Sequence, residues 1–90
     1  MEKLKVGIAG LGRIGKIHLN NLLQMSNVDV IAAMDSDIET LRYAENKGVK
    51  VFLKTYKDLL NVDEVEALII CTPTDTHADY VELAALAGKH

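Results

Sequence analysis

The chain has 90 residues, a formal net charge of −3, and 49% hydrophobic residues. This length allows one domain at most, and the acidic balance disfavours nucleic acid as a partner because nucleic acid rewards a basic surface. No apolar run is long enough for a transmembrane helix, so we expect neither a membrane partner nor a signal peptide. Cys71 is the single cysteine and cannot form an internal disulfide, which fits a reducing, cytoplasmic setting.

Strands and helices are predicted to alternate along the sequence. Two apolar strands, over about 4–9 and 28–34, flank a helix over about 13–25. We expect this helix to bury one apolar stripe and to turn its polar residues outward. The stripe consists of Ile14, Ile17, Leu22 and Met25, and the outward residues are Lys16, Asn20 and Gln24.

The second half of the chain continues the alternation. Ser36 and Glu39 form a capping-box pattern with Ser36 as the cap of the second helix, and Gly48 is placed to end that helix. The remaining predicted elements are a strand over about 50–52, a helix opening near 55–58, a strand over about 67–71 and a helix over about 77–87.

This alternation predicts an α/β fold, namely a Rossmann-like parallel sheet of four strands in the order 3-2-1-4 with helices on both faces. Residues 1–90 would form a partial, truncated doubly wound domain, with the ligand crevice between strands one and four. The fourth strand would then be an open, apolar edge. We expect the chain to self-associate through this edge as a homo-oligomer, in the simplest case a two-fold dimer.

A glycine motif stands between the first strand and the first helix. Gly10, Gly12 and Gly15 fit the pattern G-x-G-x-x-G, which suits a dinucleotide site. The first glycine permits a tight turn, the second lets a pyrophosphate approach the backbone, and the third lets helix and strand pack closely. The helix would direct N–H groups from about Gly12 to Ile14 at the phosphates.

An acid stands directly after the second strand. Its spacing from the glycine motif, about 20 residues along the sequence, is the one that a dinucleotide site requires. Asp35 can accept hydrogen bonds from the adenosine ribose, and its charge would repel a 2′-phosphate. Neither Ser36 nor Asp37 supplies a cation for such a phosphate, so the pattern favours NAD over NADP. Arg42, on the next helix, is the residue that could weaken this preference.

Several polar residues allow two interpretations. Arg13 can pair with a phosphate or remain solvated, and His77 can serve a cofactor or cap a helix. His18 is interpreted as a packed or half-exposed residue, because no second His or Cys stands at metal spacing. Cys71 is interpreted as a small buried residue and not as a nucleophile.

Three segments and one acid together resemble a known family. The segments are Gly10–His18 (GLGRIGKIH), Cys71–His77 (CTPTDTH) and Ala87–His90 (AGKH), and the acid is Asp35. They look like the N-terminal domain of the Gfo/Idh/MocA oxidoreductases, the relatives of glucose–fructose oxidoreductase and inositol dehydrogenase. The T-P-x-x-x-H pattern followed by A-G-K-H is more specific than the glycine motif.

The resemblance implies a role for each matching position. Pyrophosphate contacts would come from Gly10, Gly12, Arg13, Ile14 and Gly15, the ribose contact from Asp35, and contacts beside the cofactor from Thr72, Pro73 and His77. Tyr56 would approach the adenine side. In such proteins a second domain carries the substrate residues, and a catalytic lysine lies in a Glu-Lys-Pro segment after the A-G-K-H position. The sequence ends at His90, before these positions, so we assign it no catalytic residue. Because no second His or Cys stands at metal spacing, we also assign it no metal site.

Three functions follow from these observations. The first is the NAD-binding portion of an oxidoreductase of the inositol or sugar dehydrogenase type, whose parent transfers hydride between an alcohol carbon and nicotinamide. The second is a non-catalytic folded fragment that self-associates and binds nucleotide weakly or not at all. The third is a site for S-adenosylmethionine, which the Gly15 spacing and the Thr72–His77 segment disfavour.

Overall fold

The computed structural model of the chain describes residues 3–71 and Gly88. Strands and helices alternate over this range, as predicted. The elements are β1 (Leu4–Ala9), α1 (Arg13–Leu23), β2 (Val28–Met34), α2 (Ile38–Asn46), β3 (Val51–Leu53), α3 (Tyr56–Leu60) and β4 (Ala67–Ile70). The helix predicted over about 77–87 lies outside the described residues. No helix in the described part of the chain is long and apolar enough to cross a membrane.

The four strands form one parallel sheet in the order β3-β2-β1-β4, which confirms the predicted topology. Ala9 is aligned with Met34 on one side and with Ile70 on the other, so the strands end at one common edge of the sheet. In a sheet of this type, ligands bind outside the carboxyl ends of the strands. The residues that follow β1 and β2, which include the glycine turn and Asp35, therefore meet at the edge where a ligand is expected.

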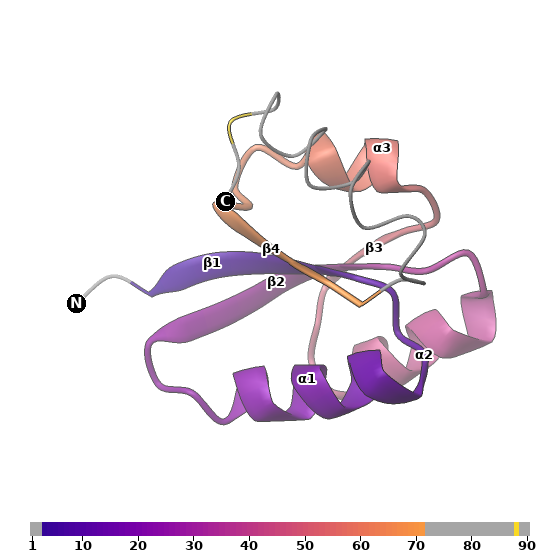
Figure 1. Ribbon diagram of the computed structural model, residues 1–90, viewed down its shortest axis with the longest axis horizontal. Coiled ribbons are helices and arrows are strands. Elements are labelled where there is room, and N and C mark those ends of the chain that lie inside the picture. The colour runs from indigo at the N-terminus through magenta and orange to yellow at the C-terminus, as the bar shows by residue number, and fades with distance from the viewer. Residues whose placement is uncertain (1–2, 72–87, 89–90) are drawn as a thin grey trace.

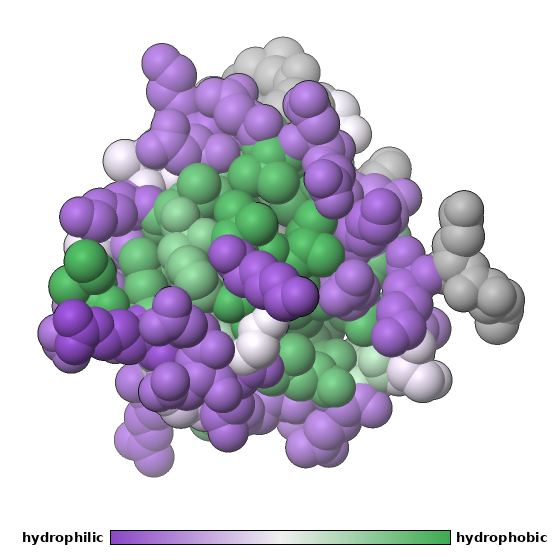
Figure 2. Space-filling model, turned by 180° about the vertical axis from the view of Figure 1, so that it is seen from behind, coloured by the Kyte–Doolittle hydropathy of each residue, from purple (hydrophilic) through white to green (hydrophobic). Residues whose placement is uncertain are grey.

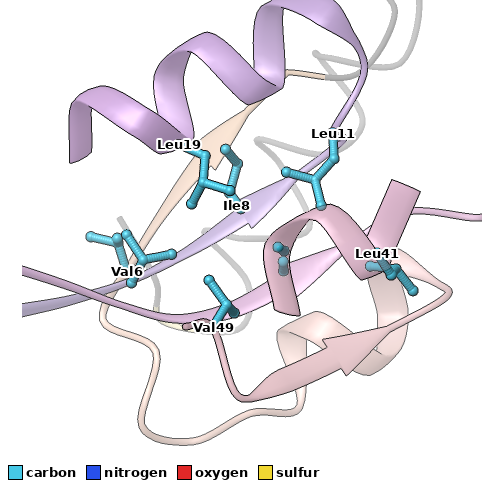
Figure 3. Close-up of a cluster of buried hydrophobic side chains, with 9 residues drawn as sticks. Val6, Ile8, Leu11, Leu19, Leu41 and Val49 are labelled. Atoms are coloured by element: carbon cyan, nitrogen blue, oxygen red, sulfur yellow. The ribbon is translucent and has the colours of Figure 1, made fainter. Parts of the chain in front are cut away.

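The helices cover both faces of the sheet, as predicted. In Figure 1, α1 and α2 lie on one side of the strands and α3 lies on the other side. Two apolar clusters fill the two interfaces. The first, shown in Figure 3, contains Val6, Ile8, Leu11, Leu19, Val30, Ala33, Leu41, Ala44 and Val49. The second contains Ala9, Ala32, Met34, Tyr56, Leu59 and Val65.

The predicted inward face of α1 is confirmed at Leu22, which packs against the first cluster, but it is wrong at Ile14, Ile17 and Met25. Gly15 and Leu19 are its buried residues, whereas Ile14 and Ile17 are 58% and 51% exposed and Met25 is exposed as well. The cause is the close contact at Gly15, because only a residue without a side chain can bring the helix axis so near to β1. The face centred on Gly15 must then point inward, and the isoleucines on either side of it are turned toward the surface.

Two residues expected on the outer face of α1 instead pack against α2. The amide Nδ2 of Asn20 donates to the hydroxyl of Tyr43 at 2.7 Å. The ammonium of Lys16 lies 5.0 Å from the centroid of the same ring, and that of Lys47 lies 5.5 Å from it. Tyr43 of α2 is therefore joined to α1 by one hydrogen bond and one cation–π contact, and the second cation–π contact, from Lys47, stays within α2 and its C-cap. Gln24 is exposed, as expected.

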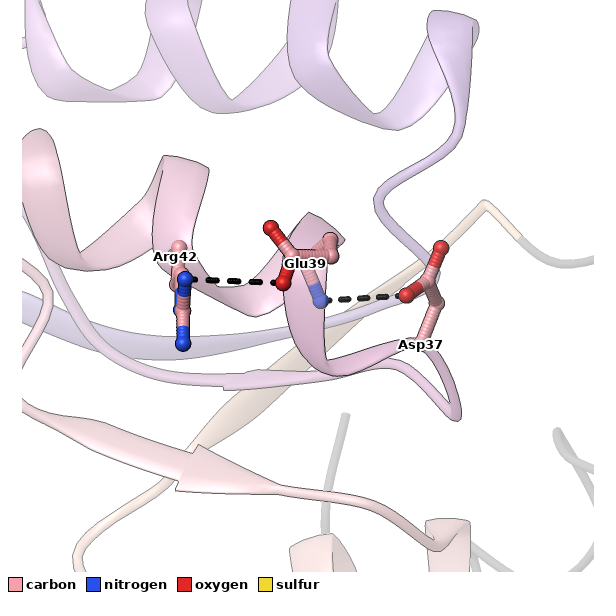
Figure 4. Close-up of polar contacts among 3 residues, drawn as sticks. All are labelled: Asp37, Glu39 and Arg42. Carbon is pink, nitrogen blue, oxygen red and sulfur yellow. Dashed lines mark hydrogen bonds and ion pairs between the residues drawn. The ribbon is translucent and has the colours of Figure 1, made fainter.

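The start of α2 also differs from the prediction. Asp37 and not Ser36 is the cap, since its Oδ1 accepts the N–H of Glu39 at 3.0 Å and its Oδ2 accepts the Thr40 hydroxyl at 3.1 Å. Figure 4 shows the first of these bonds. The predicted end of the helix at Gly48 is confirmed, since Gly48 follows α2 with φ +98°. The helix expected to open near 55–58 is α3, and the structure shows that the Thr55 hydroxyl caps it by accepting the N–H of Asp58.

The surface carries apolar area beyond the two cores. Figure 2, which views the molecule from behind Figure 1, shows apolar residues gathered on one face and ringed by hydrophilic residues. Among the described residues, the large exposed apolar side chains come from several separate elements: Leu4 from β1, Ile14, Ile17 and Leu23 from α1, Met25 from the turn after it, Ile38 from α2 and Val51 from β3. Single exposed apolar residues are ordinary in folded proteins, but a gathered group marks surface that another chain or segment can cover.

Candidate functional site

The turn between β1 and α1 has the backbone geometry expected of its first glycine. Gly10 adopts φ +93°, a left-handed conformation that side chains disfavour. Its N–H donates to the carbonyl of Met34 at 2.7 Å, which ties the turn to the end of β2. The chain can therefore leave β1 and reverse into α1 within the three residues before Arg13.

The third glycine brings α1 against this turn. A Cβ on Gly15 would collide with the carbonyl oxygen of Gly10, lie 2.9 Å from its carbonyl carbon and lie 3.5 Å from Cβ of Cys71. The contact to the Gly10 carbonyl is a backbone contact and cannot be relieved by rotating a side chain. Gly15 is therefore required by packing between α1, the turn and the end of β4.

The second glycine has the opposite environment. Gly12 is the N-cap of α1, and a Cβ built on it would meet none of the described residues within 4 Å. Within residues 3–71, no side chain caps this helix and no acid stands in its first turn. The first intrahelical bond runs from Lys16 N–H to Gly12 carbonyl at 2.9 Å, so the N–H groups of Arg13 and Ile14 precede it and have no intrahelical acceptor. This open helix start offers backbone donors and a positive dipole end to an anion.

Asp35 stands beside the turn, at the end of β2, and its carboxylate is already engaged. Oδ2 accepts the N–H of Leu11 at 2.8 Å, and Oδ1 accepts the N–H of Asp37 at 2.9 Å. Its own N–H donates to the carbonyl of Leu53 at 3.0 Å. Each carboxylate oxygen can accept a further hydrogen bond, so Asp35 can still receive donors from a ligand.

Sequence reasoning missed the role of Leu11 in this arrangement. Its side chain is fully buried in the first cluster, while its N–H points to the carboxylate of a residue 24 positions away. Leu11 is an apolar residue inside the glycine motif, and its bond to Asp35 has no local signature in the sequence. An apolar side chain there anchors the turn in the core and leaves its backbone for polar contacts.

The charged neighbours of the site come from the starts of α1 and α2. Arg13 is exposed at the start of α1. Arg42 forms an ion pair with Glu39, with 3.4 Å between Nη1 and Oε1, and both side chains are about two-thirds exposed or more, at 67% and 71% (Figure 4). Asp35 and Asp37 supply negative charge at the end of β2, and the arginine on α2 is paired with a carboxylate of its own helix.

The remaining predicted positions lie outside the glycine turn and the end of β2. Thr72, Pro73 and His77 lie outside the described residues. Tyr56, the first residue of α3, is buried in the second cluster, and its place on the adenine side stays a prediction. His18 is exposed, in contrast to the packed or half-exposed state expected. Within the described ranges, no three His, Cys, Asp or Glu side chains are placed to hold a metal ion.

Cys71 follows β4 and is half-buried, and its N–H donates to the carbonyl of Ala9 at 2.7 Å. Burial raises the pKa of its thiol above the ordinary value, because a thiolate is poorly solvated there. A cysteine of this kind is the reverse of an activated nucleophile. The structure therefore agrees with a packing role for Cys71.

Comparison with known families identifies this arrangement. Residues 4–90 match the profile of the GFO_IDH_MocA family, described as an oxidoreductase family with an NAD-binding Rossmann fold. The chain belongs to the Gfo/Idh/MocA oxidoreductase family. Its four-stranded parallel sheet, its glycine turn and its open helix start are accordingly those of an NAD-binding Rossmann fold.

Individual members of this family are similar to the chain over nearly all of its length. It is 35% identical to the myo-inositol 2-dehydrogenase of Thermotoga maritima, covering 97% of this chain and 26% of that protein. It is 32% identical to the uncharacterized oxidoreductase YrbE of Bacillus subtilis, covering 99% of this chain and 26% of that protein.

A solved family structure has the same fold. The scyllo-inositol dehydrogenase of Lactobacillus casei, crystallised with NAD(H) and scyllo-inositol, superposes with a TM-score of 0.94 at 32% identity. The match covers 99% of this chain and 27% of that one. The chain thus spans about a quarter of the length of the relatives that it matches.

Proposed function

We propose that the glycine turn of this family member holds the pyrophosphate of NAD. Gly10, Gly12 and Gly15 shape the turn, and the N–H groups of Arg13 and Ile14 donate to phosphate oxygens. The observation that carries this assignment is the uncapped start of α1, where Gly12 leaves open space among the described residues and the first turn holds no acid. An anion is the group that such a helix end favours.

Asp35 is proposed to bind the adenosine ribose of the same cofactor. Both of its oxygens already accept a backbone N–H, so ribose hydroxyls would donate to the lone pairs that remain. A 2′-phosphate would meet the charges of Asp35 and Asp37, and the ion pair with Glu39 competes for Arg42. These charges support NAD over NADP as the preferred cofactor.

Thr72, Pro73 and His77 are proposed to lie beside the cofactor. The support for this assignment is the family pattern T-P-x-x-x-H, which this sequence carries directly after β4. Cys71 immediately precedes the segment, and its Cβ lies 3.5 Å from the position that a Cβ on Gly15 would occupy. Cys71, the last described residue before this segment, thus lies next to the glycine turn.

We further propose that these residues are the cofactor portion of a longer oxidoreductase acting on an inositol or sugar. The named relatives include a myo-inositol 2-dehydrogenase and a scyllo-inositol dehydrogenase, and the chain spans about a quarter of each. Bound NAD supplies hydride acceptance from an alcohol carbon. The residues of this chain bind and orient the cofactor, while substrate and proton-transfer residues belong to the portion that the relatives carry beyond this match.

Calorimetric titration of the chain with NAD, NADP and S-adenosylmethionine tests the cofactor assignment. We expect heat from NAD, a weaker response to NADP and none from S-adenosylmethionine. Asp35→Ala should reduce the difference in affinity between NAD and NADP, because it removes one of the two carboxylates that a 2′-phosphate would face. A response to S-adenosylmethionine alone, or equal affinity for NAD and NADP in the unaltered chain, would contradict the assignment.

A second candidate function, self-association of the chain, rests on β4. This strand ends the described sheet and consists of apolar residues alone, Ala67–Ile70, without a lysine or proline to block pairing. Two chains could pair their β4 edges into one continuous sheet. Light scattering over a range of concentrations tests this: a mass that rises toward twice 9.9 kDa supports pairing, and a constant monomer mass contradicts it. The cytoplasmic location remains a prediction that rests on the single free cysteine.

A further inference from the structure

The Asp35 carboxylate joins two loops that are far apart in the sequence. Oδ2 accepts the N–H of Leu11 in the glycine turn, and Oδ1 accepts the N–H of Asp37 before α2. Asp37 continues the series, because its own carboxylate caps α2 through Glu39 N–H and the Thr40 hydroxyl. A chain of hydrogen bonds therefore runs from the glycine turn through two aspartates into the first turn of α2.

These bonds join groups of the chain itself, so they belong to the framework of the turn. Gly10 N–H is held by the Met34 carbonyl, and Leu11 N–H is held by Asp35. The next backbone donors, at Gly12 and beyond, lead into the uncapped start of α1. Asp35 therefore accepts the N–H of Leu11, the residue just before the uncapped helix start at Gly12. By fixing Leu11, the carboxylate influences the direction of the N–H groups that follow.

We infer that Asp35 is a positioning residue for the glycine turn, which it fixes in a phosphate-receiving shape before any cofactor binds. Binding of a pyrophosphate group then depends on Asp35 although the carboxylate does not touch it. A fixed donor array binds an anion better than one that must be ordered on binding. A carboxylate that served the ribose alone would do the reverse, because its negative charge repels pyrophosphate and its removal would strengthen binding.

The opposite signs allow a test with inorganic pyrophosphate, which has no ribose. The chain and its Asp35→Ala and Asp35→Asn variants are titrated with pyrophosphate while the amide signals of Gly12, Arg13 and Ile14 are followed by NMR. The matched control is Asp37→Asn, which removes a neighbouring negative charge, keeps a good helix cap and leaves the Leu11–Asp35 bond in place. We expect Asp35→Ala to weaken pyrophosphate binding about tenfold, the equivalent of one hydrogen bond to a charged group. Asp37→Asn should bind at least as well as the unaltered chain.

Amide hydrogen exchange supplies a readout that needs no ligand. Exchange at Leu11, normalised to exchange at Ile8 in the core of β1, should accelerate about tenfold in Asp35→Ala and stay unchanged in Asp37→Asn. Asp35→Asn keeps one acceptor oxygen for two N–H groups, so its exchange rate and pyrophosphate affinity should lie between those of the unaltered chain and Asp35→Ala. This variant replaces Asp35→Ala in the test if Asp35→Ala fails to fold. An unchanged Leu11-to-Ile8 ratio in the Asp35 variants, or pyrophosphate binding as tight as in the unaltered chain, would overturn the inference.

The inference depends on the proposed cofactor role of the turn only in its pyrophosphate arm. If NAD and pyrophosphate both fail to bind but Leu11 exchange accelerates in Asp35→Ala, the positioning role is correct and the cofactor assignment fails. If NAD binds but neither exchange nor pyrophosphate affinity responds to the Asp35 variants, the cofactor assignment is correct and the positioning role fails. The two results are therefore distinguishable.

Discussion

Gly15 of α1 packs directly against the backbone carbonyl of Gly10 in the turn that leads into the same helix. This contact sets how near α1 approaches β1 and which face of the helix points inward. It also places the end of β4 close by, since Cβ of Cys71 would be 3.5 Å from a side chain at Gly15. The third glycine of the motif is therefore required by packing.

Replacing Gly15 with Ala should destabilise the fold. The added methyl would meet backbone atoms of Gly10, so α1 must shift away from the turn. Forced overpacking of this kind costs about 1–3 kcal/mol of unfolding free energy, which urea denaturation followed by circular dichroism can measure. A stability equal to that of the unaltered chain would show that the turn can yield without cost.

The matched variant Gly12→Ala should leave stability nearly unchanged and weaken NAD binding. A Cβ at Gly12 has none of the described residues within 4 Å, so the unfolding free energy should change by no more than about 1 kcal/mol, the range for helix-cap changes. The methyl would occupy the space through which a phosphate approaches the helix start, so NAD affinity should fall at least about tenfold. Calorimetry on this folded variant measures the effect, and undiminished NAD binding would exclude a close phosphate approach at Gly12.

The cap of α2 gives a direct comparison of neighbouring residues. Asp37→Ala removes the acceptors for Glu39 N–H and the Thr40 hydroxyl and should cost about 1 kcal/mol of stability. Ser36→Ala should cost clearly less, because Asp37 and not Ser36 occupies the cap position of α2. Thermal or urea unfolding of the two variants decides between them, and a larger loss for Ser36→Ala would restore Ser36 as the cap.

The thiol of Cys71 should react slowly with alkylating reagents near neutral pH. Burial raises its pKa, so the thiolate fraction is smaller than in an unfolded chain at the same pH. The unfolded chain then releases this proton at lower pH than the folded chain. Any stability linked to Cys71 is therefore present below the unfolded pKa of the thiol and declines as pH rises through the alkaline range. Iodoacetamide labelling with and without denaturant compares the reaction rate of Cys71 in the unfolded and folded chains. We expect slower labelling of the folded chain, and faster labelling of it would contradict the prediction.

The sequence was sufficient for the topology and for the outline of the site. Continuous apolar strands alternating with helices leave few parallel arrangements once crossovers are right-handed, and the order β3-β2-β1-β4 follows. The glycine spacing likewise indicated which position needs φ > 0 and which needs close packing. The first inference uses the alternation of elements along the chain, and the second uses the spacing of a few consecutive residues.

Three features could not be predicted because they depend on contacts across the fold. The inward face of α1 was misassigned because hydrophobic periodicity counts Ile14 and Ile17 as core, whereas a glycine contributes no apolar signal. The cap moved from Ser36 to Asp37 because Asp35 draws the Asp37 N–H toward itself before α2 begins. The bond from Leu11 to Asp35 joins residues 24 positions apart and has no local signature.

The central claim, that the glycine turn and Asp35 form one NAD site, is tested most directly by mapping NAD onto the chain with NMR. Isotope-labelled chain is titrated with NAD, and the amide shifts are followed residue by residue. We predict that the largest changes fall on Gly12, Arg13 and Ile14 and on the residues around Asp35, with small changes over α3 on the opposite face. NAD binding with shifts centred elsewhere, or no shifts at millimolar NAD in a folded chain, would contradict the claim.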